Sequence, residues 1–229
     1  MNNPLACSEC PARDRAACSG LTEAQRDELS RLGHHRIVRR GETLFASGDD
    51  NLCATLITGA LKISSFDEHG TERILSLVHP AGFVGEMFAP VARHDVVALT
   101  DSKLCVFSRE HYEAAVDRFP ALAKAVLRRT AEDLFEARTL IELMARRTAV
   151  RRVAGFLVAM ANAASTSPCH PAARFELPLT RGEIAGMLGL TIETVSRQLT
   201  RLERDGAIAR EGARGIRLAD STRLEALAG

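Results

Sequence analysis

The sequence predicts an α+β fold with an N-terminal antiparallel β-roll, a long helix and a C-terminal winged helix-turn-helix. Short β-rich runs separated by turn signals occupy residues 36–107. Small and apolar residues then recur at alternating spacings of four and three between residues 123 and 144. Two helix-start signals around a glycine, followed by a basic strand pair, occupy residues 180–218. We therefore expect a cysteine loop (1–21), the roll (22–120), the long helix (121–145) and the helix-turn-helix domain (146–229).

The composition predicts a globular protein of the cytoplasm. The chain has 229 residues, 46% hydrophobic and 26% charged, which is enough for one large or two small domains. No apolar run approaches the roughly 20 residues that a membrane span needs. The first residues lack the basic and apolar regions of a secretory signal. We therefore expect no membrane partner, and thiols that stay reduced.

Charge is distributed unevenly along the chain. Residues 1–145 hold 17 Lys and Arg against 21 Asp and Glu, a net charge of −4. Residues 146–229 hold 13 Arg against 8 Asp and Glu, a net charge of +5. A basic C-terminal third predicts a polyanion partner such as DNA. The seven His are dispersed and no nucleophile–base constellation is recognisable, so we expect no enzyme activity.

Three cysteines crowd the stretch CSECPARDRAAC near the N-terminus. Cys7, Cys10 and Cys18 have C-x2-C-x7-C spacing. Reduced thiolates at such spacing can hold zinc or an iron–sulfur cluster, and either site normally takes four protein ligands. The fourth ligand has three candidates, which are Cys53, Cys105 and Cys169. From the residues alone, zinc, a cluster and simply reactive thiols all remain open.

The long helix carries a seven-residue pattern over about three repeats. The pattern favours a seam between two chains, although an amphipathic helix packed on its own domain would show it too. Glu132, Asp133 and Glu136 either repel a twofold-related copy or form solvated surface. The predicted dimer seam consists of Ala123, Leu127, Thr130, Leu134, Ala137, Ile141 and Met144.

The C-terminal part has the signals of a helix-turn-helix and of a base-reading helix. Thr180 and Glu183 form a capping-box pattern, Gly189 ends the first helix and Thr191 begins the second. One face of the second helix presents groups that suit major-groove edges. Arg197 can donate to guanine O6 and N7, Glu193 can accept from cytosine N4, and Ser196 can address several edges.

The rest of this helix divides into a packing face and phosphate-binding positions. We expect Ile192, Val195 and Leu199 to pack on the first helix. The alternative is a solvated helix with ordinary ion pairs. The residues expected to contact the DNA backbone are Thr180, Thr191, Thr200, Arg201 and Arg214, together with Arg204, Arg210 and Arg217.

The stretch LTRGEIAGMLGLTIETVSRQLTRLERDGAI, behind a roll and a long helix, resembles the CRP/FNR family of bacterial transcription regulators. The cyclic-AMP receptor branch has Arg and Gly where this chain has Ile192 and Ser196. The segment ETVSR is similar to the FNR branch, whose Glu-x-x-Ser-Arg reads an inverted repeat of TTGAT half-sites. The resemblance implies a cyclic-nucleotide-binding-like roll, a homodimer on DNA, RNA polymerase as a partner and an activator function.

The resemblance also implies what the roll senses. Gly85 and Glu86 match the start of the family's phosphate-binding pattern, but His94 and Asp95 follow Arg93, so an acid replaces the hydroxyl and we do not expect a cyclic nucleotide. The FNR branch implies one 4Fe-4S cluster per chain, lost in oxygen; its ligands here would be Cys7, Cys10, Cys18 and Cys105. The x7 gap departs from the enteric pattern and is similar to an alphaproteobacterial branch. The alternative is a regulator of this fold gated by thiol oxidation or a small ligand, without a cluster.

Overall fold

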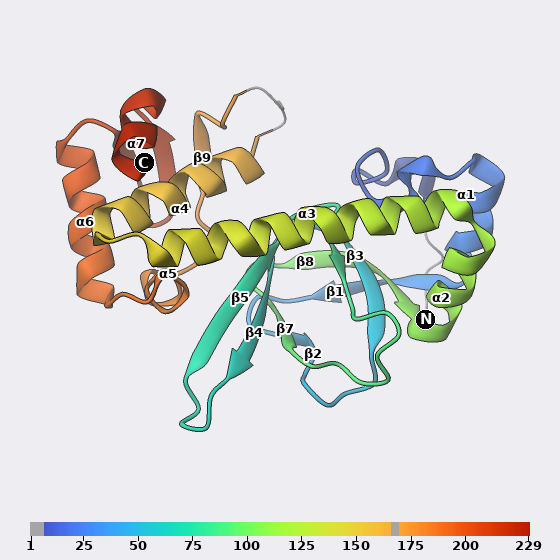
Figure 1. The fold of residues 1–229 in the computed structure, drawn as a ribbon. Coiled ribbons are helices and arrows are strands. Elements are labelled where there is room, and N and C mark those ends of the chain that lie inside the picture. The colour runs from blue at the N-terminus through green and yellow to red at the C-terminus, as the bar shows by residue number, and fades with distance from the viewer. Residues whose placement is uncertain (1–6, 166–169) are drawn as a thin grey trace. The chain divides into compact units, whose positions relative to one another are not determined.

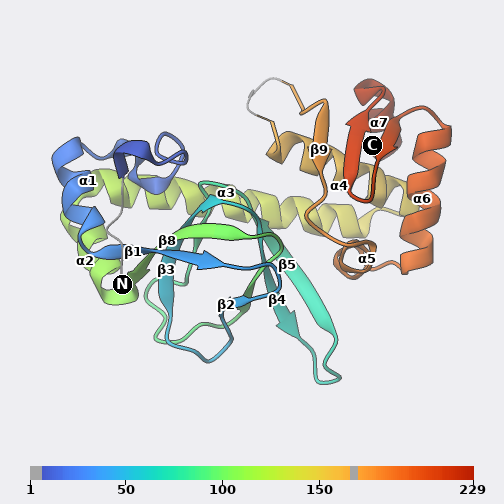
Figure 2. The same cartoon turned by 180° about the vertical axis from the view of Figure 1, so that it is seen from behind.

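Two antiparallel sheets of four strands each form the roll (Figures 1 and 2). The structure is a computed structural model that describes residues 7–165 and 170–229, so Cys169 lies outside the described residues. One sheet has the strand order β1–β8–β3–β6 and the other β2–β7–β4–β5. The strands span Gly33–Val38 (β1), Thr43–Phe45 (β2), Leu52–Thr58 (β3), Leu61–Phe66 (β4), Glu72–Val78 (β5), Phe83–Val84 (β6), Asp95–Ala98 (β7) and Ser102–Ser108 (β8).

Alternating side chains of these strands fill the roll. Leu56, Leu61 and Leu104 have no exposed surface and belong to one buried apolar cluster. Each such leucine contributes about 1.5–3 kcal/mol relative to an exposed one. The turn between β3 and β4 requires a glycine, because Gly59 has φ +101° and a Cβ there would lie 2.2 Å from the Ser102 hydroxyl oxygen.

The cysteine loop and two short helices lie at one end of the roll, and the long helix begins there (Figures 1 and 2). Thr22 and Gln25 form the expected capping box at the start of α1. Leu122 and Val126, from α3, join Tyr112 and Phe119 in a second buried cluster. The elements are the 3-10 turns Cys7–Glu9 (η1) and Ala17–Gly20 (η2), and the helices Glu23–Ser30 (α1), Arg109–Arg118 (α2) and Pro120–Ala145 (α3).

Helix α3 leaves an apolar row uncovered. Leu127, Leu134 and Ile141 are 70%, 50% and 62% exposed, and all three belong to the predicted dimer seam. Two of the three acidic residues beside them, Glu132 and Asp133, are paired within the helix. Glu132 lies 3.8 Å from Arg128 and 3.5 Å from Arg129, and Asp133 lies 3.0 Å from Arg129. These ion pairs weaken the expectation that bare carboxylates would repel a second chain.

The chain divides into two compact units, Met1–Ala137 and Arg138–Gly229. The second unit contains a helix-turn-helix and confirms the predicted fold class. Its sheet has three strands in the order β10–β11–β9, one more than the predicted two-stranded wing, because β9, which precedes α5, pairs with β11. The elements are Ala149–Ala163 (α4), Arg174–Glu176 (β9), Arg181–Leu188 (α5), Ile192–Arg204 (α6), Ile208–Glu211 (β10), Gly215–Leu218 (β11) and Ser221–Ala228 (α7).

Candidate nucleic-acid interface and cysteine site

The turn between α5 and α6 is fixed by its own residues and by α4. The Thr180 hydroxyl accepts from the Glu183 N–H at 3.2 Å, and the Glu183 carboxylate accepts from the Thr180 N–H at 2.8 Å. Gly189 ends α5 with φ +62°. From α4, Arg152 donates to the Leu188 carbonyl oxygen at 3.2 Å, so a cation caps the C-terminal end of α5. Helix α6 therefore starts from a turn that is held by hydrogen bonds on both sides.

The buried face of α6 differs from the prediction at one residue. Val195 and Leu199 are buried as expected. Ile192 lies against Gly182 of α5 but is 53% exposed, so it packs on the first helix only in part. A Cβ added at Gly182 would lie 3.6 Å from the Ile192 Cδ1 atom, so this glycine lies beside the isoleucine. A glycine offers no side chain to cover the isoleucine.

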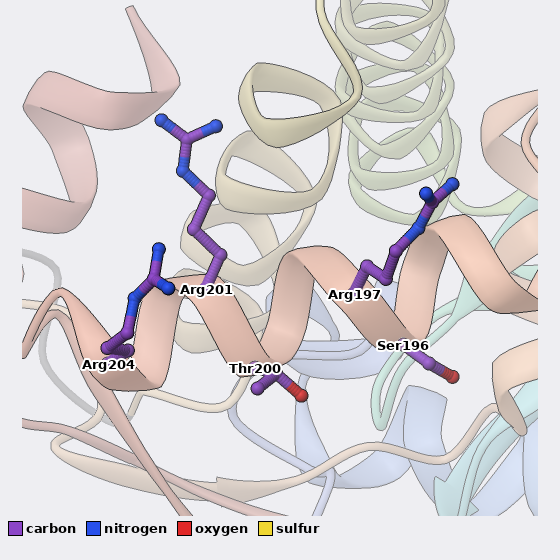
Figure 3. Close-up of a pocket in the computed structure, with 5 residues that line it drawn as sticks. All are labelled: Ser196, Arg197, Thr200, Arg201 and Arg204. Atoms are coloured by element: carbon purple, nitrogen blue, oxygen red, sulfur yellow. The ribbon is translucent and has the colours of Figure 1, made fainter.

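The opposite face of α6 brings the predicted base-reading residues together. An open hollow on this face is lined by Ser196, Arg197, Thr200, Arg201 and Arg204 (Figure 3). Glu193 is exposed one turn before, and Thr191 caps the helix by accepting from the Thr194 N–H at 3.3 Å. The pKa of Glu193 is lowered by its own backbone N–H and by the Thr191 hydroxyl, with a smaller effect of Arg197. The carboxylate is thus ionised at neutral pH and can only accept hydrogen bonds.

The arginines expected to contact phosphates lie either on α6 or on the wing, which is formed by β10 and β11. Arg201 lies 3.6 Å from Asp205 in an exposed ion pair, which is weak and easily exchanged for a phosphate. Arg210 donates to the Glu203 carboxylate at 2.8 Å, and this bond ties the wing to α6. Arg217 lies 3.2 Å from Glu211, and Arg214 donates to the Pro178 carbonyl oxygen at 3.2 Å. Of the wing arginines, Arg214 alone has no carboxylate partner among the described residues.

The four predicted cysteine ligands lie close to one another. Cys7, Cys18 and Cys105 pack against the same buried cluster, and Cys10 packs with Cys18 against a small group of alanines. The pKa of the Cys105 thiol is raised to about 12, first by burial and then by the charges of the three N-terminal cysteines. The N-terminal loop therefore brings its thiols within electrostatic range of β8.

The thiols as placed do not form a closed metal site. Within residues 7–165 and 170–229, no three His, Cys, Asp or Glu side chains are gathered closely enough to hold a metal ion. The chemistry of the four thiols suits a soft metal centre, because Cys is the usual ligand of iron–sulfur clusters and of structural zinc. Cys53 is fully buried in the roll and burial raises its pKa to about 12, so it behaves as a core residue.

Sequence reasoning missed the residue that anchors the cysteine loop, which is Arg26. Its side chain is 8% exposed and donates to the carbonyl oxygens of Cys18 at 3.2 Å and Leu21 at 2.9 Å. It also pairs with Glu23 at 3.0 Å. No local signal marks this arginine, since its segment reads as an ordinary charged helix.

The position that holds phosphate in cyclic-nucleotide relatives is internally satisfied. The Arg93 guanidinium lies 3.3 Å from the Glu86 carboxylate, and His94 Nδ1 lies 3.0 Å from the same group. The Asn51 side chain accepts from the Glu86 N–H at 3.2 Å. Arg93 and Glu86 thus form an ion pair with each other at this position.

None of the helices that the structure describes is both long and apolar enough to cross a bilayer.

Two family models match this chain. Residues 35–119 match the model of the cyclic nucleotide-binding domain, and residues 151–227 match that of the Crp-like helix-turn-helix domain.

Two curated relatives and one solved structure cover most of the chain. The transcriptional activator protein FnrL of Cereibacter sphaeroides is 35% identical over 95% of this chain and 90% of its own length. The nitrogen fixation regulation protein FixK of Bradyrhizobium diazoefficiens is 33% identical over 97% of this chain and 93% of its own. The structure of FixK2 from Bradyrhizobium japonicum is similar with a TM-score of 0.77 and 28% identity, over 86% of this chain and 98% of that one.

Proposed function

Because the chain belongs to the CRP/FNR family of transcription regulators, we propose that it is an oxygen-responsive activator that binds DNA as a homodimer. Its relatives are transcription regulators and not enzymes. The sensor half of the proposal rests on the approach of Cys105 to the N-terminal cysteines. The DNA half rests on the polar and basic face of α6. We place the protein in the cytoplasm, where its operators are.

Helix α6 reads bases in the major groove of each half-site. Arg197 donates to a guanine, Glu193 accepts from a cytosine and Ser196 contacts a third edge. The backbone contacts come from Thr180, Thr191, Thr200, Arg201 and Arg214. By resemblance to the FNR branch, the operator is an inverted repeat of TTGAT-type half-sites. Two recognition helices one helical turn apart require a twofold dimer.

The seam of α3 supplies that dimer. It presents Leu127, Thr130, Leu134, Ala137, Ile141 and Met144, of which four are exposed large apolar side chains. Apolar residues at this spacing are typical of a helix face that a second helix covers in a coiled coil. On DNA, the dimer would work with RNA polymerase as its partner.

The site proposed for a 4Fe-4S cluster consists of Cys7, Cys10, Cys18 and Cys105. When bound, such a cluster would supply sensitivity to oxygen, since its loss ends DNA binding in this proposal. The chain's own residues provide the link to the seam. Cys7, Cys18 and Cys105 pack against the buried cluster that also contains Leu122 and Val126 of α3. Holding the loop on β8 therefore orders the start of the helix that dimerises.

Anaerobic purification tests the sensor half. The wild-type protein is expected to be brown, with about four irons and four sulfides per chain, and to lose this absorption in air. Cys105→Ala is expected to lose the iron, whereas Cys53→Ala, which changes a buried thiol outside the site, is expected to keep it. A colourless anaerobic protein that holds only zinc, or equal iron in both variants, would contradict the proposal.

A second function is a regulator gated by thiol oxidation or a small ligand, with no cluster. One observation favours it, because the described thiols are not gathered closely enough to hold a metal ion. Binding of the operator by iron-free protein in air separates the two functions. Full binding by the iron-free protein supports this alternative, and loss of binding supports the cluster.

A further inference from the structure

Arg181 contacts one of the proposed base-reading residues. It is the first residue of α5, and its Nη1 atom donates to the Ser196 hydroxyl oxygen at 3.4 Å. Its side chain is exposed, and among the residues that the structure describes it has no carboxylate partner. The partner of this guanidinium is thus a neutral hydroxyl on the recognition helix.

The stability of α5 does not explain this arginine. A cation in the first turn of a helix faces the positive end of the helix dipole, which is unfavourable by a few tenths of a kcal/mol. The favourable charge in this turn is Glu183, which already completes the capping box with Thr180. The helix dipole therefore gives no reason for an arginine at this position.

The Ser196 hydroxyl keeps its hydrogen free for DNA. Serine and threonine inside helices commonly donate to the carbonyl four residues earlier. Thr130 in α3 does so, donating to the Val126 carbonyl oxygen at 3.1 Å. Among the described residues, Ser196 donates to no group and accepts only from Arg181. Figure 3 shows Ser196 leaving α6 on the other edge of the helix from Arg197. The cation that contacts Ser196 is Arg181.

We propose that Arg181 is a specificity-determining residue, which fixes Ser196 as a hydrogen-bond donor to the base it reads. A hydroxyl has one hydrogen to donate and two lone pairs. Donation from a cation occupies one lone pair, repels a further N–H and strengthens the O–H as a donor. Ser196 then prefers thymine O4, guanine O6 or N7, or adenine N7, and disfavours the amino group of cytosine. This inference rests on the proposed DNA-reading function and narrows it.

Operator binding by the anaerobically purified full-length dimer tests the inference. The ligand is a duplex with TTGAT inverted repeats in which each base pair of the half-site is replaced in turn. Ser196→Ala locates the pair that Ser196 reads, as the position where discrimination disappears. At that pair, we expect wild type to prefer an acceptor edge over a cytosine edge by roughly 5- to 10-fold. Arg181→Met should reduce that preference to about the level of Ser196→Ala, and the double variant should lose nothing more.

Two controls separate this role from simpler ones. Arg223→Met, at an exposed position of α7, removes the same charge from the same unit and should leave discrimination unchanged. Arg181→Met could instead weaken binding to all operators equally and reduce the slope of log affinity against log salt concentration by about one. Arg181 would then be only a phosphate contact, and the inference would be wrong. If neither Ser196→Ala nor Arg197→Ala alters discrimination at any pair, the proposed reading helix fails instead. Circular dichroism confirms that each variant is folded.

Discussion

Arginines that look alike in the sequence take different roles, because the fold gives each of them a different partner. Arg26 is buried against the carbonyl oxygens of the cysteine loop, and Arg152 caps a helix 36 residues away. Arg210 is held by Glu203 and so contributes to the position of the wing. Arg197 makes one long bond, from Nη2 to the Thr194 hydroxyl at 3.3 Å. Its guanidinium is therefore available to a base.

Replacing Arg197 with alanine tests its role as a base reader. We expect a loss of about 1–3 kcal/mol of discrimination at the guanine that it contacts, because two donated hydrogen bonds disappear. Competition binding with operators that differ at that pair measures the loss. The matched control is Arg201→Ala, which should weaken binding to all sequences alike and reduce the salt slope by about one. Equal weakening by Arg197→Ala on every sequence would make it a phosphate contact instead.

Among the secondary-structure elements, the helix pair α5–α6 depends most on local chemistry. Both helices begin at a threonine whose hydroxyl accepts from a backbone N–H three residues on. The turn between them passes through the left-handed conformation at Gly189. Because hydrogen bonds hold this turn, the packing of the buried face of α6 also sets the direction in which its polar face points.

Gly189→Ala is expected to destabilise the protein by about 1–2 kcal/mol, because a Cβ is strained at φ +62°. The midpoint of urea unfolding, followed by circular dichroism, measures the change. Gly182→Ala provides the control within the same helix. Gly182 has ordinary helical backbone and its added Cβ would lie 3.6 Å or more from its neighbours, so it should gain up to about 1 kcal/mol. Similar effects of both substitutions would disprove the role of the turn.

The elements that sequence reasoning anticipated are those with signals inside one segment. The capping boxes at Thr22 and Thr180 and the glycine turn confirm this for the helices. What it missed depends on contacts between distant segments. Strand β9 pairs with β11 some 40 residues later, and the exposure of Ile192 depends on a glycine in another helix. The prediction that Cys105 lies near the N-terminal thiols depended on the family resemblance, since no spacing rule links residues so far apart.

For the chain as a whole, the exposed row of apolar side chains on α3 indicates that two chains assemble through this helix. Large apolar side chains exposed at heptad spacing are an unstable surface for a single chain in water. The arginines that pair with Glu132 and Asp133 keep nearby charge from opposing a second copy. The dimer is therefore expected to depend on the seam itself.

Leu134→Lys is expected to weaken dimerisation by at least about tenfold, because a cation replaces an apolar side chain at a paired position. Sedimentation of the anaerobic protein over a range of concentrations measures the change, and binding to the inverted repeat should fall with it. Phe135→Lys is the matched control, since Phe135 is 70% exposed on the same helix but lies outside the seam. Dimerisation weakened equally by the two would place the interface elsewhere on α3.

Small residues of the cysteine loop and of the turn before β6 set how readily that loop opens. Ala12, Ala16 and Ala81 form a separate buried group there, against which Cys10 and Cys18 pack. Alanine buries little apolar area and has no rotamers to lose, so these contacts hold the loop with a small part of the domain's stability. The loop can then open as a local unit while the roll stays folded. Its backbone amides should exchange hydrogen for deuterium well before those of β8, and an oxidant or chelator would reach its thiols at a rate governed by that local equilibrium.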